Sequence, residues 1–341
     1  MHFAGPRSSE IGNVRVERKN RESVEISWET PLRDLIVSIY MGRSPVAIDR
    51  RSPAAKVRGK INVRISGLDP GTRYYFEVMP QGGPGVITAE RLVPLEGPAN
   101  FRDMGGYATS NGSRVRWGHI YRSDNLANLS EKDRAVLKQM GIGLVCDLRT
   151  TPETSKWPDR LPDDGSIDYL QIPIIHGERE FDFYWEKIGR GDVGWLTENF
   201  MIAANKRIID EYGEMLGKII HILAQPETPP MVFHCAGGRD RTGVCAALIL
   251  LALGVPEETI IYDYCLSGVF ISKRMEVINS RIRARGVDPA TVALYYTAPP
   301  HFFVPVIEHI KEAYASSAHY LRTEAGISEE TLDRLKQKLL E

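Results

Sequence analysis

The residues best suited to chemistry lie in one short loop, HCAGGRDRTG, at residues 234–243. The loop places Cys235 six positions before Arg241, with small or polar residues between them. Its glycines permit positive φ and a close approach of the backbone, so main-chain N–H groups can surround the sulfur. A bowl of this kind suits a phosphate group, and the combination predicts hydrolysis of a phosphate ester through a phosphocysteine intermediate.

Two apolar segments flank this loop. Residues 230–233 are apolar and partly β-branched, which predicts a buried strand. Residues 242–253 are apolar on every side, which predicts a core helix that ends before Gly254 and Pro256. The loop therefore lies at the N-terminus of a buried helix. Free N–H groups and the positive end of the helix dipole favour a dianion and a thiolate there.

Each polar residue of the loop has an expected task in this reaction. Arg241 can hold two phosphate oxygens with its planar guanidinium, and Asp240 is the predicted acid for the leaving oxygen and base for the attacking water. The phosphate contacts are expected from Ala236, Gly237, Gly238, Arg239 and Thr242. Thr242 would donate its hydroxyl to the leaving sulfur, and Arg239 would add positive charge at the rim. His234 either orients the loop or is an ordinary core histidine.

The loop resembles the signature of the atypical bacterial and fungal tyrosine/serine phosphatases, which carry an aspartate just before the loop arginine. The resemblance covers nearly all of residues 96–341, and it implies Cys235 as nucleophile, Arg241 as phosphate binder and Asp240 as acid and base. Members of this group usually have lysine at the position of Arg239. That lysine is associated with activity on phosphoinositides as well as on phosphoproteins, and arginine keeps the charge but changes the geometry.

Other segments carry further candidate acids and supporting residues. Asp159 ends the tripeptide WPD, the acid-loop sequence of animal-type tyrosine phosphatases, but it lies much farther before the cysteine than in those enzymes, so we interpret it as a turn residue. Asp182 is a third candidate acid. The segments 100–106, 121–124 and 147–153 resemble further motifs of the atypical group. Their charged residues either brace the loop or form ordinary buried ion pairs: Arg102, Asp103, Arg122, Asp147 and Arg149.

Charge and composition limit the possible partners. With 43 basic and 44 acidic residues the net charge is −1, so no global field attracts nucleic acid. The 341 residues, 43% of them hydrophobic, suffice for two domains with cores of their own. No cysteine has the spacing of a metal site; we expect no metal or other cofactor and no inhibition by chelators. No stretch reaches transmembrane length.

The cysteines and the first residues bear on the compartment. The four cysteines lie in the later part of the chain in mostly apolar surroundings, which predicts reduced thiols and a cytoplasmic location. Residues 1–21 lack the pattern of a signal peptide, but a chain trimmed of its leader would look the same, so export of such a form stays open. Cys146 is either a partner for a protective disulfide with Cys235 or an inert packed thiol.

Residues 1–95 differ in character and are predicted to form a separate domain. Short alternating or apolar segments are separated by turns of Gly, Pro and Asp: residues 23–29, 35–40, 60–65 and 74–78. This pattern predicts an antiparallel β-sandwich. The segment resembles a fibronectin type III domain, because Trp28 matches its buried tryptophan and residues 68–74 match the turn of its tyrosine corner. The domain either binds a partner protein, positions a substrate or braces the other half.

Residues 96–341 are predicted to form an α/β domain of the cysteine-phosphatase type, with a mostly parallel sheet flanked by helices. The expected elements are strands near 142–148 and 168–174, helices near 131–140 and 197–224, and two amphipathic helices after residue 300. Ser130 and Ser328 are expected N-caps. The aromatic-rich segment 181–185 either covers the site and stacks on a phosphotyrosyl ring or packs between helices.

These observations predict a cysteine-dependent phosphomonoesterase that acts on phosphotyrosine, with phosphoserine and phosphothreonine as further substrates. Two alternatives stay open: a phosphoinositide phosphatase, which the doubly basic loop favours, and an inactive phosphate-binding adaptor, against which the intact Cys235, Asp240 and Arg241 argue. The expected partners are a phosphorylated protein or a phosphoinositide, and a protein that binds the N-terminal domain.

Overall fold

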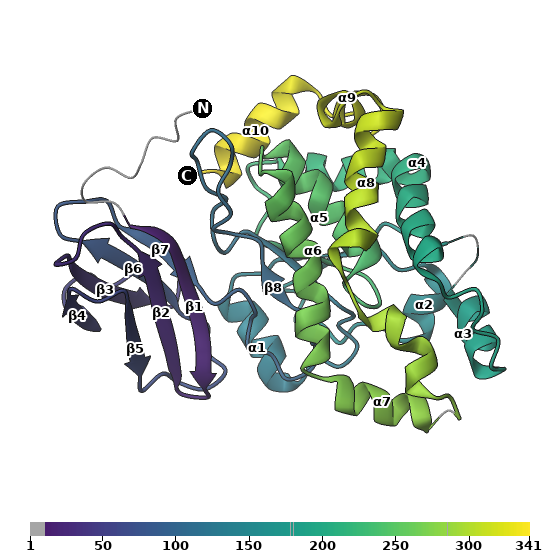
Figure 1. The fold of residues 1–341 in the computed structure, drawn as a ribbon, viewed down its shortest axis with the longest axis horizontal. Coiled ribbons are helices and arrows are strands. Elements are labelled where there is room, and N and C mark those ends of the chain that lie inside the picture. Colours follow the sequence, from purple (N-terminus) through teal and green to yellow (C-terminus); the bar gives the residue numbers. More distant parts are fainter. Residues whose placement is uncertain (1–10, 178, 180, 285) are drawn as a thin grey trace.

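Seven strands within residues 11–95 form an antiparallel sandwich (Figure 1). The computed structural model describes residues 11–341 apart from 178, 180 and 285. One sheet has the order β1–β2–β5: Gly12–Asn20, Ser23–Glu29 and Asn62–Ser66. The other has the order β4–β3–β6–β7: Ala55–Arg58, Ile36–Gly42, Tyr75–Pro80 and Val86–Ala89. The predicted all-β fold is confirmed, and β1, β4 and β7 add to the expected segments.

The inner faces of the two sheets pack around Trp28, which is 2% exposed. Val24 and Ile26 share its face, because side chains two positions apart on a strand point the same way. The Tyr74 hydroxyl bonds back to Asp69, at 3.2 Å from its main-chain N and 3.1 Å from its carboxylate. This bond is the tyrosine corner that the sequence predicts, and Trp28 is a core residue as expected.

Five of the described strands form the sheet of the second domain, in the order β11–β10–β12–β9–β8. In that order they are Asp168–Gln171, Leu144–Asp147, Met231–His234, Ile120–Ser123 and Arg102–Asp103. Neighbours run parallel except for the antiparallel pair β8–β9. Because β12 is central and buried, it delivers the residues that follow it to the sheet edge at which parallel α/β proteins bind ligands.

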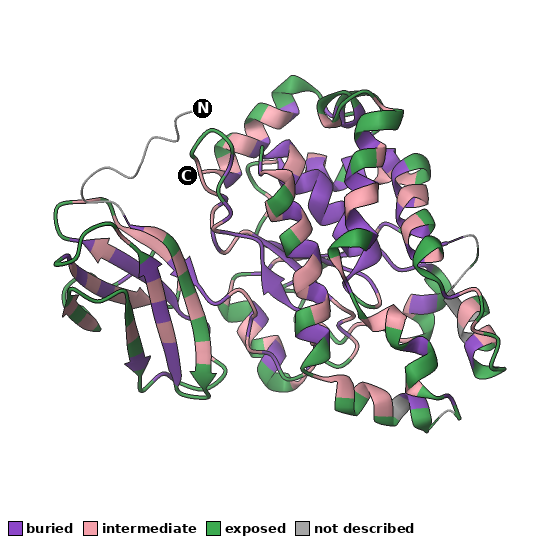
Figure 2. Ribbon diagram, in the orientation of Figure 1, coloured by how far each residue is buried: buried purple, intermediate pink, exposed green. Residues whose placement is uncertain are grey.

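Helix α5 (Asp240–Ala252) follows the loop directly and forms the centre of the α/β domain (Figure 2). All of its residues except Leu251 are buried, as its apolar surface on every side predicts. Helices α4 (Glu198–Leu223) and α6 (Glu257–Ser272) pack against it. The predicted phosphate loop therefore begins a helix that other helices enclose.

The remaining helical segments are α1 (Glu131–Gln139), α2 (Thr151–Lys156), α3 (Phe181–Gly189), α7 (Met275–Arg283), the 3-10 helix η1 (Pro289–Tyr296), α8 (Pro300–Ala313), α9 (Ser317–Thr323) and α10 (Glu329–Leu339). Ser130 and Ser328 cap α1 and α10 as predicted. Residues 300–341 hold three helices where we expected two, because Ala315 has a φ of +62° and Ser316 starts α9. Among the described residues, no helix has the length and hydropathy needed to cross a membrane.

The two domains share a buried interface. The guanidinium of Arg73, from the sandwich, lies 2.9 Å from the carboxylate of Asp103 on β8, and these side chains are 2% and 0% exposed. Beside this pair the hydroxyls of Tyr75 and Tyr121 are 3.0 Å apart. Trp117 of the α/β domain packs with Tyr75 in a cluster that also contains sandwich residues. The sandwich is thus part of the packed body of the protein and braces β8 and β9.

The linker between the domains is also held in place. Arg274, at the junction of α6 and α7, donates hydrogen bonds to the carbonyls of Leu95, Glu96 and Gly97. From the other side the carboxylate of Asp133 accepts the N–H groups of Glu96 and Gly97 at 2.7 and 2.8 Å. These contacts support the stiff linker that its proline-rich sequence predicts. The division at residues 95/96 itself stays a prediction.

Replacing Arg73 with leucine tests the interface. The Asp103 carboxylate would stay buried without its cation, which typically costs 3–5 kcal/mol. Because Asp103 also accepts the N–H groups of Gly105 and Gly118, we expect the free energy of unfolding to fall by about 3 kcal/mol, measured by urea titration. The matched control is Arg58→Leu, which breaks an exposed ion pair with Asp34. An equal effect of the two substitutions would contradict a structural interface.

Candidate active site

The loop after β12 is shaped by a close approach of two backbones. Gly238 has a φ of +64°, and a Cβ at this position would lie 2.5 Å from main-chain atoms of Ser123 and Asp124. Only glycine fits there. The N–H of Gly238 points back into the bowl and donates to the Sγ of Cys235 at 3.3 Å. A main-chain donor therefore faces the sulfur at the N-terminus of α5, the arrangement that the sequence predicts.

A small pocket lies over this sulfur. Its walls include most of the loop, and four residues from other segments complete them: His176, Ile271, Tyr295 and Tyr296. Among the predicted phosphate contacts, Ala236, Gly237 and Arg239 belong to the walls. Gly238 and Thr242 do not. The Thr242 hydroxyl is buried and has no hydrogen-bond partner among the described residues, so the structure leaves its expected bond to the sulfur unmade.

Arg241 is held at the pocket by Glu153, which lies on α2. Its Nη1 and Nη2 are 2.6 and 2.7 Å from the two carboxylate oxygens, and Nη1 also donates to the Ile174 carbonyl at 3.2 Å. Burial alone would lower the pKa of Arg241, but Glu153 outweighs burial and raises it, so the guanidinium stays a cation. The paired geometry fixes the plane of the fork that would bind phosphate.

Glu153 is a site residue that the sequence analysis missed. It also accepts the N–H of Thr150 at 3.0 Å and so belongs to the capping box that starts α2. A threonine followed three positions later by glutamate was the visible signal. That signal predicts a helix start, and it carries no information about the distant arginine.

Arg239 is placed differently from our prediction. Its side chain is 2% exposed, and its Nε and Nη2 bind the carboxylate of Asp240 at 2.8–3.0 Å. Its Nη1 donates to the carbonyls of Tyr295 and Thr297 at 2.6 Å each. The prediction that Arg239 adds positive charge at the rim of the pocket is therefore wrong, because its guanidinium is buried and ties the loop to η1.

Asp240 lies in the pocket wall with its carboxylate charged. Burial alone would raise its pKa, but the Arg239 guanidinium and the His176 ring outweigh burial and lower the pKa to about 2. Asn205 and Tyr264 add weaker contacts, each 3.4 Å from the same carboxylate oxygen. At neutral pH this carboxylate is an anion, which suits a base for water. An acid for the leaving oxygen needs an additional source of a proton.

Arg102 and Arg122 form a buried ion cluster with Asp263 of α6, and their contacts support the alternative that they brace the loop. Arg122 donates from Nη2 to the Gly238 carbonyl at 2.9 Å, and its Nη1 is 2.5 Å from Asp263. Arg102 lies 3.1 Å from the same carboxylate and contacts Asn100, whose amide donates to the Gly238 carbonyl at 3.0 Å. One loop carbonyl is thus held by two donors that a buried ion cluster orients.

Of the two alternatives for Asp103, the structure supports the ordinary buried ion pair. Its carboxylate accepts from Arg73 of the sandwich and from the N–H groups of Gly105 and Gly118. In a two-residue strand, neighbouring side chains point to opposite faces. Arg102 therefore faces the loop while Asp103 faces the other domain.

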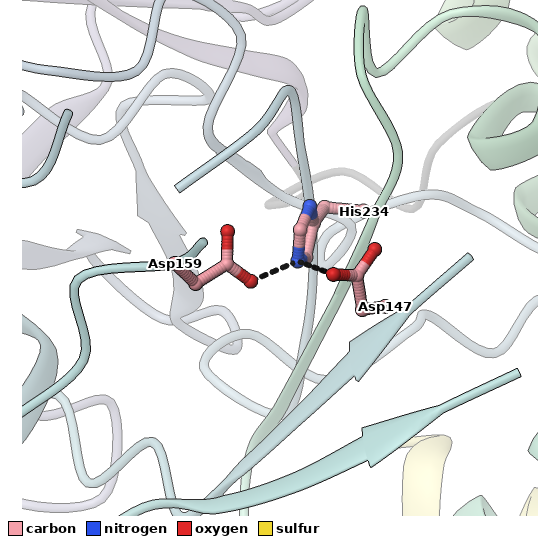
Figure 3. Close-up of side chains that lie close together, drawn as sticks. All are labelled: Asp147, Asp159 and His234. Atoms are coloured by element: carbon pink, nitrogen blue, oxygen red, sulfur yellow. Dashed lines mark ion pairs between the residues drawn. The ribbon is translucent and has the colours of Figure 1, made fainter. Parts of the chain in front are cut away.

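The side chains of His234, Asp147 and Asp159 lie close together at the start of the loop (Figure 3), and Arg149 joins them; none of the four is more than 3% exposed. The His234 Nε2 is 2.8 Å from Asp159 and 3.8 Å from Asp147. Burial alone would lower the pKa of His234, but the two carboxylates outweigh it and raise it. Arg149 lies 2.7 Å from each carboxylate. This arrangement supports His234 as a residue that positions the strand end.

The same cluster answers two questions about the sequence. Asp159 is not among the pocket walls and pairs with Arg149 and His234, which supports our interpretation that it is not the acid. Asp147, Asp159 and His234 have the atom types and spacing of a metal site. The Arg149 guanidinium already supplies a positive charge to both carboxylates, so the cluster does not fit a metal ion.

The aromatic wall of the pocket comes from an unexpected segment. Tyr184 packs against Trp195 and Phe200, with ring centroids 4.7 and 5.3 Å apart, and the pocket is instead lined by Tyr295 and Tyr296. The side chains of Phe181, Asp182 and Trp185 lie outside the described residues, and with them the third candidate acid. The adjacent tyrosines at the end of η1 were the only signal, and their spacing does not relate them to the loop.

Cys146 lies on β10 as a buried free thiol, and Cys245 is buried one turn into α5. Burial raises the pKa of both thiols. A thiol that resists ionisation is a poor nucleophile toward an oxidised partner. This supports the interpretation of Cys146 as an inert packed residue.

Comparison with known proteins gives four matches. Residues 93–341 match the model of a family described as the tyrosine phosphatase family. The chain is 28% identical over 277 residues to the triple specificity protein phosphatase PtpB of Mycobacterium tuberculosis, covering 72% of this chain and 98% of that protein. It is 26% identical over 231 residues to a tyrosine-protein phosphatase of Nostoc commune, covering 64% and 73%. The sixth fibronectin type III domain of human fibronectin type III domain containing protein 3 is similar at 21% identity, covering 29% of this chain and 95% of that chain, with a TM-score of 0.22.

Proposed function

Since the chain belongs to the tyrosine phosphatase family, we propose that it dephosphorylates phosphotyrosine in proteins through a phosphocysteine at Cys235. One observation carries this proposal: the Cys235 sulfur accepts an N–H of its own loop at the start of α5 and shares a pocket with the guanidinium of Arg241. A nucleophile and a cation for the equatorial oxygens are thereby placed together. Positioning and electrostatic stabilisation are what phosphoryl transfer requires of a protein.

The reaction has two steps. The Cys235 sulfur forms a bond to phosphorus while the ester bond breaks, and Asp240 donates a proton to the leaving oxygen. Water then attacks the phosphocysteine, its proton returns to Asp240, and the sulfur leaves as a thiolate. Arg241 and the loop N–H groups hold the charge that develops on the phosphoryl oxygens.

The pocket walls favour an aromatic ester over an inositol lipid. Ile271, Tyr295 and Tyr296 give the pocket an apolar and aromatic wall, which suits a tyrosyl ring. Arg239 replaces the lysine associated with lipid activity, and its guanidinium is already bound to Asp240 and to carbonyls of η1. The one loop feature that favoured phosphoinositides is therefore engaged elsewhere. Phosphoserine and phosphothreonine are proposed as slower substrates.

The role of the sandwich and the compartment are proposals as well. The buried Arg73–Asp103 pair supports a bracing role for the N-terminal domain beside any partner protein that it binds. The four free cysteines support the cytoplasm, where thiols stay reduced. Export of a leader-trimmed form is the other proposal for the compartment.

Two measurements test the proposed function. Acid-quenched enzyme and phosphotyrosyl peptide should yield, by mass spectrometry, a phosphate on the peptide that contains Cys235; a phosphate on any other residue, or no released phosphate, would sink the proposal. In parallel, kcat/KM for the phosphotyrosyl peptide should exceed that for a short-chain phosphatidylinositol phosphate by about 100-fold. The polar inositol ring cannot pack against the aromatic wall of the pocket as a tyrosyl ring would. A preference for the lipid would identify the alternative enzyme.

A further inference from the structure

His176 is an ionisable pocket residue with no role in the reaction above. It follows β11, and its Nε2 lies 3.7 Å from the carboxylate of Asp240. The side chain is only 9% exposed, and Nε2 has no hydrogen-bond partner among the described residues. Phe200 lies edge-on against the ring, with centroids 6.2 Å apart. A buried imidazole nitrogen without a hydrogen-bond partner costs stability, so its position next to the proposed acid calls for an explanation.

The acid role of Asp240 leaves a gap that His176 can fill. Asp240 is an anion at neutral pH because Arg239 donates to it. A departing tyrosyl or seryl oxygen needs a proton, and a carboxylate that gives up its proton so readily holds little of it at neutral pH. A second basic group beside the carboxylate raises the proton affinity of the two together.

We propose that His176 and Asp240 share one proton and act as a pair that protonates the leaving oxygen. This rests on the proposed function, and it makes His176 a residue that acts through Asp240. The contact between Nε2 and the carboxylate, both in the wall of the pocket that contains Cys235, carries the proposal.

The proton balance of the pair follows the two steps. When the sulfur–phosphorus bond forms and the ester bond breaks, the shared proton moves to the ester oxygen and leaves a carboxylate and a neutral imidazole. When water attacks the phosphocysteine and the sulfur–phosphorus bond breaks, one proton of the water returns to the pair. No other reactant is consumed, and the pair ends each cycle as it began.

The charges around the imidazole ring explain why a bound phosphate would favour the protonated form of the pair. The described groups that act on His176 are Asp240 and Glu153, which favour its cation, and Arg239 and Arg241, which oppose it. Burial lowers the pKa of His176 to about 4, with the two arginines adding to this and the carboxylates opposing it. A phosphate dianion beside Arg241 offsets the arginine charges and favours the proton on the pair. The proton is then present when the substrate is.

Removing the imidazole should affect poor leaving groups most. We expect His176→Gln to lower kcat for phenyl phosphate by about 30-fold at neutral pH, and for the activated ester p-nitrophenyl phosphate by less than about threefold, with KM nearly unchanged. The alkaline limb of the kcat profile for phenyl phosphate should move to lower pH by about one unit, because the pair then loses its proton more easily. His301→Gln, an exposed histidine on α8, is the matched control.

A double-mutant comparison separates a partner of Asp240 from a structural residue. In an Asp240→Asn background His176→Gln should change kcat by less than about twofold, since the pair is already broken. Equal losses for both esters at every pH, or full additivity with Asp240→Asn, would overturn the proposal. His176→Phe keeps the ring volume and repeats the test if the glutamine variant is unstable.

The unaltered protein offers a test that needs no variant. With tungstate as a phosphate analogue, nitrogen chemical shifts of His176 should show that the imidazole gains a proton or a hydrogen bond to Asp240 at neutral pH. A ring that stays neutral and unbonded would overturn the proposal even where turnover and the phosphocysteine are normal. If the wild-type protein showed no turnover at all, the proposed function itself would fail.

Discussion

A Cys235→Ser variant should lose turnover of phosphotyrosyl peptide by about 10⁴-fold or more, the scale on which removal of a covalent nucleophile acts. The Gly238 N–H faces the Cys235 sulfur, and a serine hydroxyl in the same place is a much weaker nucleophile than the sulfur. The variant keeps Gly238, Arg241 and Glu153, so it should still bind the phosphopeptide. Initial rates and isothermal titration calorimetry measure the two properties.

The control for this prediction is Cys265→Ser. Cys265 is a partly exposed free cysteine on α6, and it is not a wall of the pocket. Its replacement should leave kcat/KM within about twofold, as expected for a surface substitution away from the chemistry. If Cys235→Ser retained a rate within tenfold of the wild type, the sulfur would not be the nucleophile and the proposed function would fall.

The local parts of this fold and site were predictable because their causes are local. The strand β12, the glycine-rich loop and the helix α5 follow each other in the sequence, and each has its own pattern of apolar residues or glycines. The caps at Ser130 and Ser328 and the tyrosine corner at Tyr74 bond within five positions along the chain. In each case the residue type and its neighbours determine the bond.

The parts that could not be predicted depend on partners far apart in the chain. Glu153 and Arg241 are 88 positions apart, and Arg239 reaches a carbonyl 58 positions away. The sequence gives the charge of each side chain, and only the packed sheet and helices decide which opposite charge or carbonyl it meets. We therefore placed Arg239 at the rim of the pocket. An arginine beside a phosphate loop can lie there when no buried acceptor binds its guanidinium, and the sequence does not show such acceptors.

The same limit applies to His176 and to Asp263. His176 follows an edge strand and meets the loop only because β11 and β12 flank β10 in one sheet. Asp263 lies on α6, 161 positions from Arg102. Neither residue stands in a motif with a known spacing to the cysteine, so a single sequence shows no reason to connect them with it.

Asp263→Asn should cause the largest loss of stability among single substitutions near the site. Its side chain is 1% exposed and faces two buried arginines, Arg102 and Arg122, and it accepts the Tyr107 hydroxyl at 2.8 Å. Asparagine keeps the shape and removes the only carboxylate paired with either arginine among the described residues. Breaking one buried pair costs about 3–5 kcal/mol, a large part of the ~5–15 kcal/mol that holds a typical protein folded. Urea titration at neutral pH should show a loss at or above this range.

The stability that Asp263 contributes should depend on pH in a direction set by its pKa. Burial alone would raise the pKa of Asp263, but Arg102 and Arg122 outweigh burial and hold the pKa well below its ordinary range. A carboxyl with a depressed pKa contributes its full stability above the unfolded value of about 3.9, and loses it as the pH falls toward the folded value. The difference between wild type and Asp263→Asn should therefore be constant from pH 8 to about pH 5 and shrink below pH 4.

The kinetic effect should follow from the loop carbonyl that this cluster positions. Without Asp263 the Arg122 guanidinium loses the contact that aims it at the Gly238 carbonyl, and a small misplacement of the loop can cost about 100-fold in rate. We expect kcat to fall more than KM rises, under conditions where the variant is still folded. The control is Glu257→Gln, which removes an exposed ion pair with Lys311 at the start of α6. A stability loss below about 1 kcal/mol for Asp263→Asn, or one equal to that of the control, would show that the buried arginines do not depend on this carboxylate and that the loop is held by its own backbone.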